Sequence, residues 1–124
     1  MIEILVVEDE QSVAGALRVI LEDRGYIVRV AVTGREGIGL ARAHPFDVTI
    51  SDYRLPDITG TDLLDAVSKI NPENYTVLIT AHSTPELIAE AHARGIHAML
   101  TKPFPPSEIL ALLTGLVERT HDAR

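Results

Sequence analysis

The segment ILVVEDE, residues 4–10, decides how the rest of the chain is interpreted. Its apolar half predicts a buried β-strand, and its acidic half places Glu8, Asp9 and Glu10 directly at the end of that strand. Carboxylates this close to one another repel. Either water screens them on an ordinary acidic loop, or a positively charged group belongs beside them.

The composition is that of a globular domain with one hydrophobic core, because the chain has 124 residues, 46% hydrophobic and 23% charged. No apolar run approaches the roughly 20 residues that span a bilayer, and the start of the chain lacks the features of a secretory signal. We therefore expect a cytoplasmic protein without a membrane partner. The absence of cysteine excludes a disulfide framework and a cysteine-based zinc site. The net charge of −7 argues against a broad nucleic-acid-binding surface.

Apolar runs of strand length alternate with amphipathic stretches of helical periodicity along the chain. The predicted strands are residues 2–7, 27–32, 46–51, 76–79 and 96–100. Because these runs are apolar on both faces, they indicate a mostly parallel sheet covered by helices on each side. The predicted fold is a doubly wound α/β domain formed by residues 1–124, in which residues 119–124 are the fraying end of a helix.

Helix boundary signals lie between the predicted strands. Thr33 and Glu36 have the spacing of a capping box. Pro85 suits the first turn of a helix. Glycines stand where two helices should end, at Gly25 and Gly95. These signals agree with the alternation of strands and helices.

Chemically distinctive residues follow the predicted strands. Open α/β sheets bind ligands beyond the carboxyl ends of their strands, and the residues expected there are Glu8, Asp9, Asp52, Thr80 and Lys102. Clustered carboxylate oxygens are ligands that magnesium prefers, and magnesium also takes phosphate oxygens. An aspartate at such a site can attack phosphorus and form an aspartyl phosphate. Asp52 is the favoured nucleophile because it ends the central strand.

Each of these residues also has an ordinary structural explanation when it is taken singly. Glu8 and Asp9 suit a solvated loop before a helix, and Asp52 suits an Asx turn. Thr80 suits a strand, and Lys102 suits the solvated surface. Their joint placement at the strand ends favours a functional site.

Four segments, ILVVEDE, DVTISDYRLPDITG, VLIT and TKPF, together resemble the receiver domain of two-component response regulators. The resemblance covers essentially the whole chain. It implies the flavodoxin-like strand order 2-1-3-4-5 and phosphorylation of Asp52 by a phosphohistidine on a sensor kinase or a histidine phosphotransfer protein. It also implies a switching surface that binds a downstream effector protein or a fused output domain, without direct binding of nucleic acid by this chain.

The resemblance assigns a magnesium site to this chain. Asp9, Asp52 and the main-chain carbonyl of Arg54 would bind the ion directly, and Glu8 would act through a metal-bound water. The chemistry implied is phosphorylation and dephosphorylation of the domain itself rather than turnover of a separate substrate.

The same resemblance assigns the residues that contact the phosphoryl group. Thr80 would hydrogen-bond one phosphoryl oxygen and Lys102 would pair with another, and the Lys102–Pro103 peptide bond would be cis. Receiver domains usually carry an aromatic switch residue three positions before the lysine, where this chain has Met99. Switching through this position is therefore expected to be weak or rerouted, with a plain core methionine as the alternative.

Arg54 and His82 follow Asp52 and Thr80 by two residues, positions that in the family flank the attacking water. We expect them to shield or order that water.

The remaining acids and histidines receive ordinary interpretations. Glu10 and Asp57 are interpreted as surface acids or helix caps, and surface or edge positions are expected for His44, His92, His97 and His121.

Three other functions compete with a phosphorylated signalling domain. An aspartate-dependent phosphatase needs a second aspartate two residues after the nucleophile, where this chain has Arg54. A flavin-binding electron carrier needs a phosphate-binding loop after the first strand, where the acids at residues 8–10 would repel phosphate. A degenerate receiver that binds partners without phosphorylation is disfavoured by the complete set of acids, threonine and lysine.

Overall fold

The computed structural model describes the backbone of residues 1–122 and the side chains of residues 1–115. The strands are β1 (Glu3–Val7), β2 (Ile27–Ala31), β3 (Val48–Asp52), β4 (Tyr75–Thr80) and β5 (Ala98–Thr101). The helices are α1 (Gln11–Glu22), α2 (Gly34–Ala43), α3 (Gly60–Ile70), α4 (Pro85–Ala93) and α5 (Pro106–Asp122). The fraying predicted for residues 119–124 and the placement of His121 lie outside the residues described at side-chain level.

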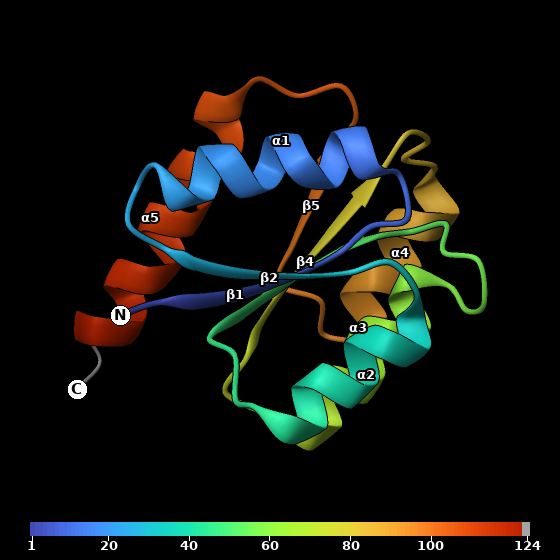
Figure 1. The fold of residues 1–124 in the computed structure, drawn as a ribbon. Helices are drawn as coiled ribbons and strands as arrows, with labels where there is room; N and C mark the ends of the chain where they lie inside the picture. Colours follow the sequence, from blue (N-terminus) through green and yellow to red (C-terminus); the bar gives the residue numbers. More distant parts are fainter. Residues whose placement is uncertain (123–124) are drawn as a thin grey trace.

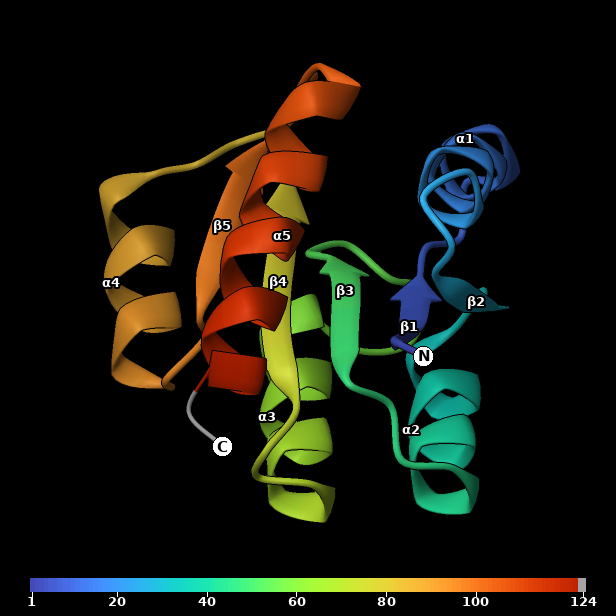
Figure 2. The ribbon, with the colours of Figure 1, turned by 90° about the vertical axis from the view of Figure 1, so that its left-hand side faces the viewer.

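All five strands are parallel and follow the order β2-β1-β3-β4-β5, which confirms the predicted order 2-1-3-4-5. Helices α1 and α5 cover one face of the sheet, and α2, α3 and α4 cover the other (Figure 1). The arrows of β1, β3, β4 and β5 point toward the same end of the sheet (Figure 2), and β2 pairs in parallel with β1. The doubly wound α/β fold is therefore confirmed, and residues that follow the strands gather at one rim.

Alternating side chains of the central strands pack into different helical layers. Ile4 and Val6 of β1 belong to the core beneath α1 and α5, which also contains Ile109. Leu5 and Val7 point to the opposite face and pack with residues of α2 and α3. Both faces of the sheet are thus buried, as the continuous apolar runs predicted.

The helix boundaries follow the sequence signals. The Thr33 hydroxyl accepts a hydrogen bond from the main-chain N–H of Glu36 at the start of α2. Gly25 and Gly95 have positive φ angles of 86° and 75°, in the left-handed region that favours glycine.

Among the helices that the structure describes, none is long and apolar enough to cross a membrane.

The strand boundaries differ from the predicted ones by one or two residues. The differences are largest for two strands: β3 begins at Val48 rather than at residue 46 and includes Asp52 as its last residue, and β5 begins at Ala98 rather than at residue 96. Phe46 is buried because its ring packs between the sheet and the layer of α2 and α3, not because it belongs to a strand. The predicted third strand was therefore too long at its start, because the buried apolar residue there does not pair in the sheet.

Candidate functional site

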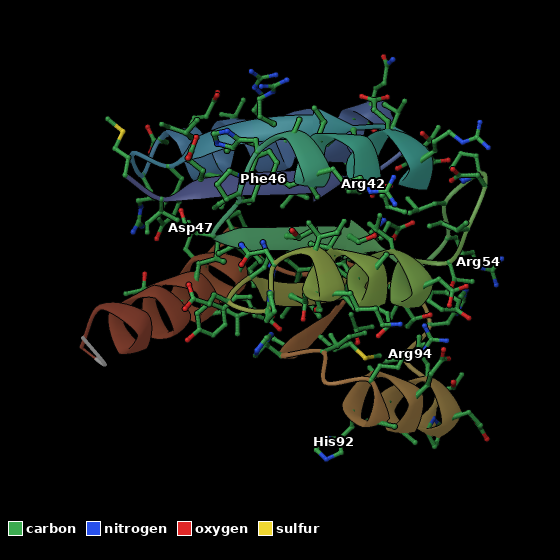
Figure 3. All side chains as sticks on the ribbon, turned by 90° about the horizontal axis from the view of Figure 1, so that it is seen from below. Arg42, Phe46, Asp47, Arg54, His92 and Arg94 are labelled. Atoms are coloured by element: carbon green, nitrogen blue, oxygen red, sulfur yellow. The ribbon has the colours of Figure 1, made fainter. Side chains whose placement is uncertain are left out.

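The candidate site lies at the carboxyl ends of β1, β3, β4 and β5. Asp47 precedes β3 and Arg54 follows it, and the two residues lie at opposite ends of the sheet (Figure 3). Asp52 is paired in register with Ile79 of β4, and Thr80 with Thr101 of β5. The sheet therefore brings together residues that are far apart along the chain.

Three carboxylates form the centre of the site. Glu8, Asp9 and Asp52 each offer one oxygen atom, and these oxygens all lie within 4.8 Å of one another. Glu8 and Asp52 are buried, whereas Asp9 is exposed to solvent. Oxygen atoms in this arrangement are suited to a hard divalent cation such as magnesium.

Lys102 contacts two of these carboxylates. Its Nζ atom lies 2.8 Å from Oε1 of Glu8 and 3.0 Å from Oδ1 of Asp52. The resemblance implied a lysine aimed at a phosphoryl group, and it did not predict this ion pair with Glu8. The main-chain N–H of Lys102 also donates to the carbonyl of Thr80 at 2.7 Å, which fixes the start of the lysine segment beside β4.

Burial and charge set the protonation of the ion pair. Burial raises the pKa of Glu8, the hydrogen bond from Lys102 opposes this shift, and the negative charge of Asp52 adds to it. For Lys102, burial alone would lower the pKa, but its hydrogen bonds to Glu8 and Asp52 and their charges outweigh burial and raise it. Lys102 is therefore held as a charged ammonium, and ionisation of Glu8 is more costly than that of a glutamate in water.

Thr80 lies at the end of β4 and is buried there, with 4% of the residue exposed. Its hydroxyl accepts a hydrogen bond from the main-chain N–H of His82 at 3.1 Å. A pocket of about 240 Å³ opens beside it, lined by Tyr53, Arg54, Thr80, His82, Thr84, Glu86, Leu87 and Glu90. The structure thus brings Arg54 and His82 to one pocket with Thr80.

The loop between β3 and α3 closes on itself. The main-chain N–H of Gly60 donates to the carbonyl of Tyr53 at 2.7 Å, and Arg54 and Thr59 form an isolated antiparallel bridge. A Cβ atom on Gly60 would overlap the main-chain carbonyl of Asp52. Glycine is therefore required where α3 begins against the end of β3.

Asp57 caps a helix from a distance, a role that local sequence signals did not show. Its carboxylate accepts hydrogen bonds from the main-chain N–H groups of Gly34 and Arg35, the first residues of α2. The general interpretation as a surface acid or helix cap is consistent with this contact, but nothing in the sequence paired residue 57 with α2. Glu10 stands at the N-cap of α1 and makes no side-chain capping bond there.

Other predicted residues have clear positions. The Lys102–Pro103 peptide bond is cis, as the resemblance implied. Met99 is half-buried and packs against the cluster beneath α4, so the described structure gives it the position of a core side chain. Among the histidines, His92 points away from the sheet (Figure 3).

Two histidines make contacts that the sequence did not show. His44 Nε2 lies 2.8 Å from Oε1 of Glu3. His97 Nδ1 accepts a hydrogen bond from the main-chain N–H of Thr76 at 3.0 Å, on the edge strand side of the sheet. Both therefore remain surface or edge residues, but with defined partners.

The fold and the site together define a class: doubly wound α/β domains with an acidic cluster and a lysine at the carboxyl ends of their strands. The chain matches the model of the response regulator receiver domain over residues 4–114. It is 35% identical over 108 residues to a response regulator receiver protein of Anaeromyxobacter, covering 87% of this chain and 45% of that protein. The chain spans about half the length, or less, of the curated relatives it matches.

Solved structures agree with this match. A CheY-like receiver domain from Methanospirillum hungatei superposes with a TM-score of 0.92 at 28% identity, covering 98% of each chain. The chemotaxis protein CheY4 of Vibrio cholerae superposes with a TM-score of 0.88 at 33% identity, covering 94% of this chain and 98% of that one. The chain therefore belongs to the receiver domain family of two-component response regulators. Members of this family are signalling modules that interact with kinases and downstream effectors.

Proposed function

We propose that this chain accepts a phosphoryl group on Asp52 in a magnesium-dependent reaction. The proposed donor is a phosphohistidine on a sensor kinase or a histidine phosphotransfer protein. The observation that supports the proposal most strongly is the convergence of Glu8, Asp9, Asp52 and Lys102 at one rim of the sheet. Membership of the receiver domain family supports the same assignment.

The donor set suits magnesium because the clustered side chains offer only carboxylate oxygens within 4.8 Å of one another. Asp9, Asp52 and the main-chain carbonyl of Arg54 would hold the ion directly, with Glu8 acting through a water. When bound, the ion neutralises negative charge on the transferred phosphoryl group. The Lys102 ammonium forms ion pairs with Glu8 and Asp52, so it balances part of their negative charge before the ion binds.

The proposed transfer makes one bond and breaks another. A carboxylate oxygen of Asp52 attacks phosphorus, the bond from phosphorus to the donor atom breaks, and the donor leaves with the electron pair. The Lys102 ammonium then balances charge on one phosphoryl oxygen, and the Thr80 hydroxyl donates a hydrogen bond to another. Hydrolysis by water would reverse the modification and release phosphate.

Arg54 and His82 are proposed to shield or order that water, because both line the pocket beside Thr80. Met99 is proposed to transmit the change weakly or by another route, since it packs as a flexible apolar side chain and has no hydroxyl. The surface that changes would bind a downstream effector protein or an output domain fused to this chain, in the cytoplasm. No direct contact of this chain with nucleic acid is proposed.

Intact-mass measurement after incubation with magnesium and acetyl phosphate tests the proposal. The wild-type chain should gain one phosphoryl group, and Asp52→Ala should gain none. Asp23→Ala is a matched control, because Asp23 is an exposed aspartate at the end of α1 and its side chain makes no described contact with the site. An equal gain in Asp52→Ala would refute the assignment. Multiple turnover of a phosphate ester would favour the phosphatase instead.

A further inference from the structure

The Asp57 carboxylate accepts hydrogen bonds from three main-chain N–H groups. Its Oδ1 atom accepts from the main-chain N–H of Gly34 at 2.8 Å, and its Oδ2 atom accepts from that of Arg35 at 2.8 Å. Oδ1 also accepts from the N–H of Ile58, the next residue in its own loop, at 3.1 Å. The hydrogen bonds from Arg35 and Gly34 lower the pKa of Asp57, so the carboxylate is fully ionised where it meets the N-terminus of α2.

The contact between this loop and α2 is close as well as charged. A Cβ atom on Gly34 would overlap the side chain of Ile58 and lie 3.2 Å from Oδ1 of Asp57. Glycine at position 34 therefore lets the loop approach the helix closely enough for both N–H groups to reach the carboxylate. The contact is thus shaped by residues on both sides.

Helix α2, whose first turn binds Asp57, packs against β1, the strand that leads into two of the site carboxylates. A Cβ atom on Gly37 of α2 would lie 2.9 Å from Cγ2 of Val7, the last residue of β1. Glu8 and Asp9 follow Val7 directly. The position of α2 is therefore fixed relative to the start of the acidic segment.

At its other end, the loop is closed beside Asp52. The Gly60 N–H bonds the Tyr53 carbonyl, and the Arg54–Thr59 bridge joins the two sides of the loop. Asp57 stands at the tip of this closed loop. Its hydrogen bonds thus connect the segment that contains Arg54 to the helix packed against β1.

We infer that Asp57 is a positioning residue for the divalent cation. By fixing the loop between β3 and α3 to the first turn of α2, it holds the main-chain carbonyl of Arg54 in register with Glu8 and Asp9. The inference rests on the proposed function, because that function assigns the Arg54 carbonyl to the cation. Asp57 itself touches neither the ion nor the phosphoryl group, and it acts only through the backbone that it holds.

Removal of this contact should change the magnesium requirement rather than the maximal rate. In Asp57→Ala, the dissociation constant for magnesium, measured by isothermal titration calorimetry, should rise about tenfold, as is typical for groups that orient metal ligands without contacting the metal. The rate of phosphorylation by acetyl phosphate should fall at low magnesium and return to the wild-type value at saturating magnesium. A residue that only stabilised α2 would lower the melting temperature and leave the magnesium dissociation constant unchanged.

Two further variants separate the contact from its charge. Asp57→Asn keeps Oδ1 for Gly34 but has no acceptor for the Arg35 N–H, so its magnesium affinity should lie between those of wild type and Asp57→Ala. Glu36→Gln removes one negative charge from the same turn of α2, and its magnesium affinity should equal that of wild type. Asp57→Asn also serves as the test if Asp57→Ala does not fold.

The outcomes distinguish the inference from the proposed function. If Asp57→Ala and Asp57→Asn bind magnesium as wild type does, or no more weakly than Glu36→Gln, the positioning role is wrong and the proposed function stands. If wild type binds magnesium but is never phosphorylated, the proposed function is wrong and the magnesium shift still tests Asp57. If wild type binds no magnesium, the positioning role is wrong.

Discussion

The ammonium of Lys102 lies 3.0 Å from Oδ1 of Asp52, and the same nitrogen lies 2.8 Å from Oε1 of Glu8. One positive charge therefore stands among three clustered carboxylates, whose third member is Asp9. When all three are ionised, the cluster carries an excess of two negative charges. A divalent cation balances this excess, and the phosphoryl group would bring its own negative charge toward the same lysine.

Replacement of the lysine should have opposite effects on metal binding and on chemistry. In Lys102→Ala, magnesium should bind more tightly, because the carboxylates lose a competing cation close to the metal position. Phosphorylation should be about 100-fold slower or more, because a preorganised group that stabilises the transferred charge is missing. Calorimetry and the rate of mass gain measure the two quantities.

Lys69→Ala is the matched control for this prediction, because the Lys69 side chain on α3 is 78% exposed and, among residues 1–115, forms an ion pair with Asp65 of its own helix rather than with the site. Its magnesium affinity and phosphorylation rate should equal those of wild type. A Lys102→Ala protein that is phosphorylated at the wild-type rate would contradict the assigned role.

The Thr80 hydroxyl is expected to act in the transfer rather than in folding. Thr80→Val keeps the branched shape in its buried position but removes the O–H group, and phosphorylation should slow about tenfold, the value of one modest hydrogen bond. Thr80→Ser retains the hydroxyl and should restore most of the rate. Equal rates in Thr80→Val and wild type would exclude a hydrogen bond from this residue to the phosphoryl group.

Replacement by alanine should change the free energy of unfolding in opposite directions at Gly60 and at Gly15. A Cβ atom at Gly60 would overlap the Asp52 carbonyl, so Gly60→Ala should lower the free energy of unfolding by about 1–3 kcal/mol. Gly15 lies in α1, and a Cβ atom added there would meet no heavy atom within 4 Å, so Gly15→Ala should raise it by about 0.5–1 kcal/mol. Urea unfolding measures both, and a stabilising Gly60→Ala would show that the close approach is wrong.

His97 should make stability depend on pH. Burial lowers its pKa below the ordinary value of 6.5, and Nδ1 accepts a hydrogen bond in the neutral form. The unfolded chain therefore binds a proton before the folded chain does. The stabilising contribution of neutral His97 is complete above pH 6.5 and is lost as pH falls through 6.5 toward the lower pKa of the folded state.

Urea unfolding at about pH 8 and about pH 5 checks this prediction, since these values bracket the ordinary range of histidine. His97→Gln cannot titrate, so it should lose less stability between the two conditions than wild type does. His92→Gln should behave as wild type, because the exposed His92 side chain on α4 points away from the sheet, whereas His97 Nδ1 accepts a hydrogen bond from the main-chain N–H of Thr76. A His97→Gln protein with the full wild-type loss would place the titration elsewhere.

The strand order and the gathering of Asp52, Thr80 and Lys102 could be predicted because they follow from local patterns and from the parallel sheet. Once the strands are parallel, their carboxyl ends meet at one rim regardless of distance along the chain. The strand limits were less accurate, since Phe46 is apolar and buried without pairing in the sheet. Local hydrophobicity therefore predicts which residues are buried better than it predicts which residues form the main-chain hydrogen bonds of the sheet.

The contacts of Asp57 and the pairing of Lys102 with Glu8 could not be predicted in this way. Asp57 and Gly34 are separated by 23 positions, and Lys102 and Glu8 by 94. Both contacts depend on how loops turn after the strands end, which no periodic pattern encodes. Individual side-chain partners at the rim therefore required the three-dimensional structure.

Mapping of the phosphorylated residue tests the central claim most directly. The wild-type chain is incubated with acetyl phosphate with and without magnesium, reduced with borohydride to convert an aspartyl phosphate to homoserine, and analysed by peptide mass spectrometry. We predict homoserine at position 52 only when magnesium is present. Reduction at another aspartate, or equal modification of Asp52 without magnesium, would contradict the proposed site.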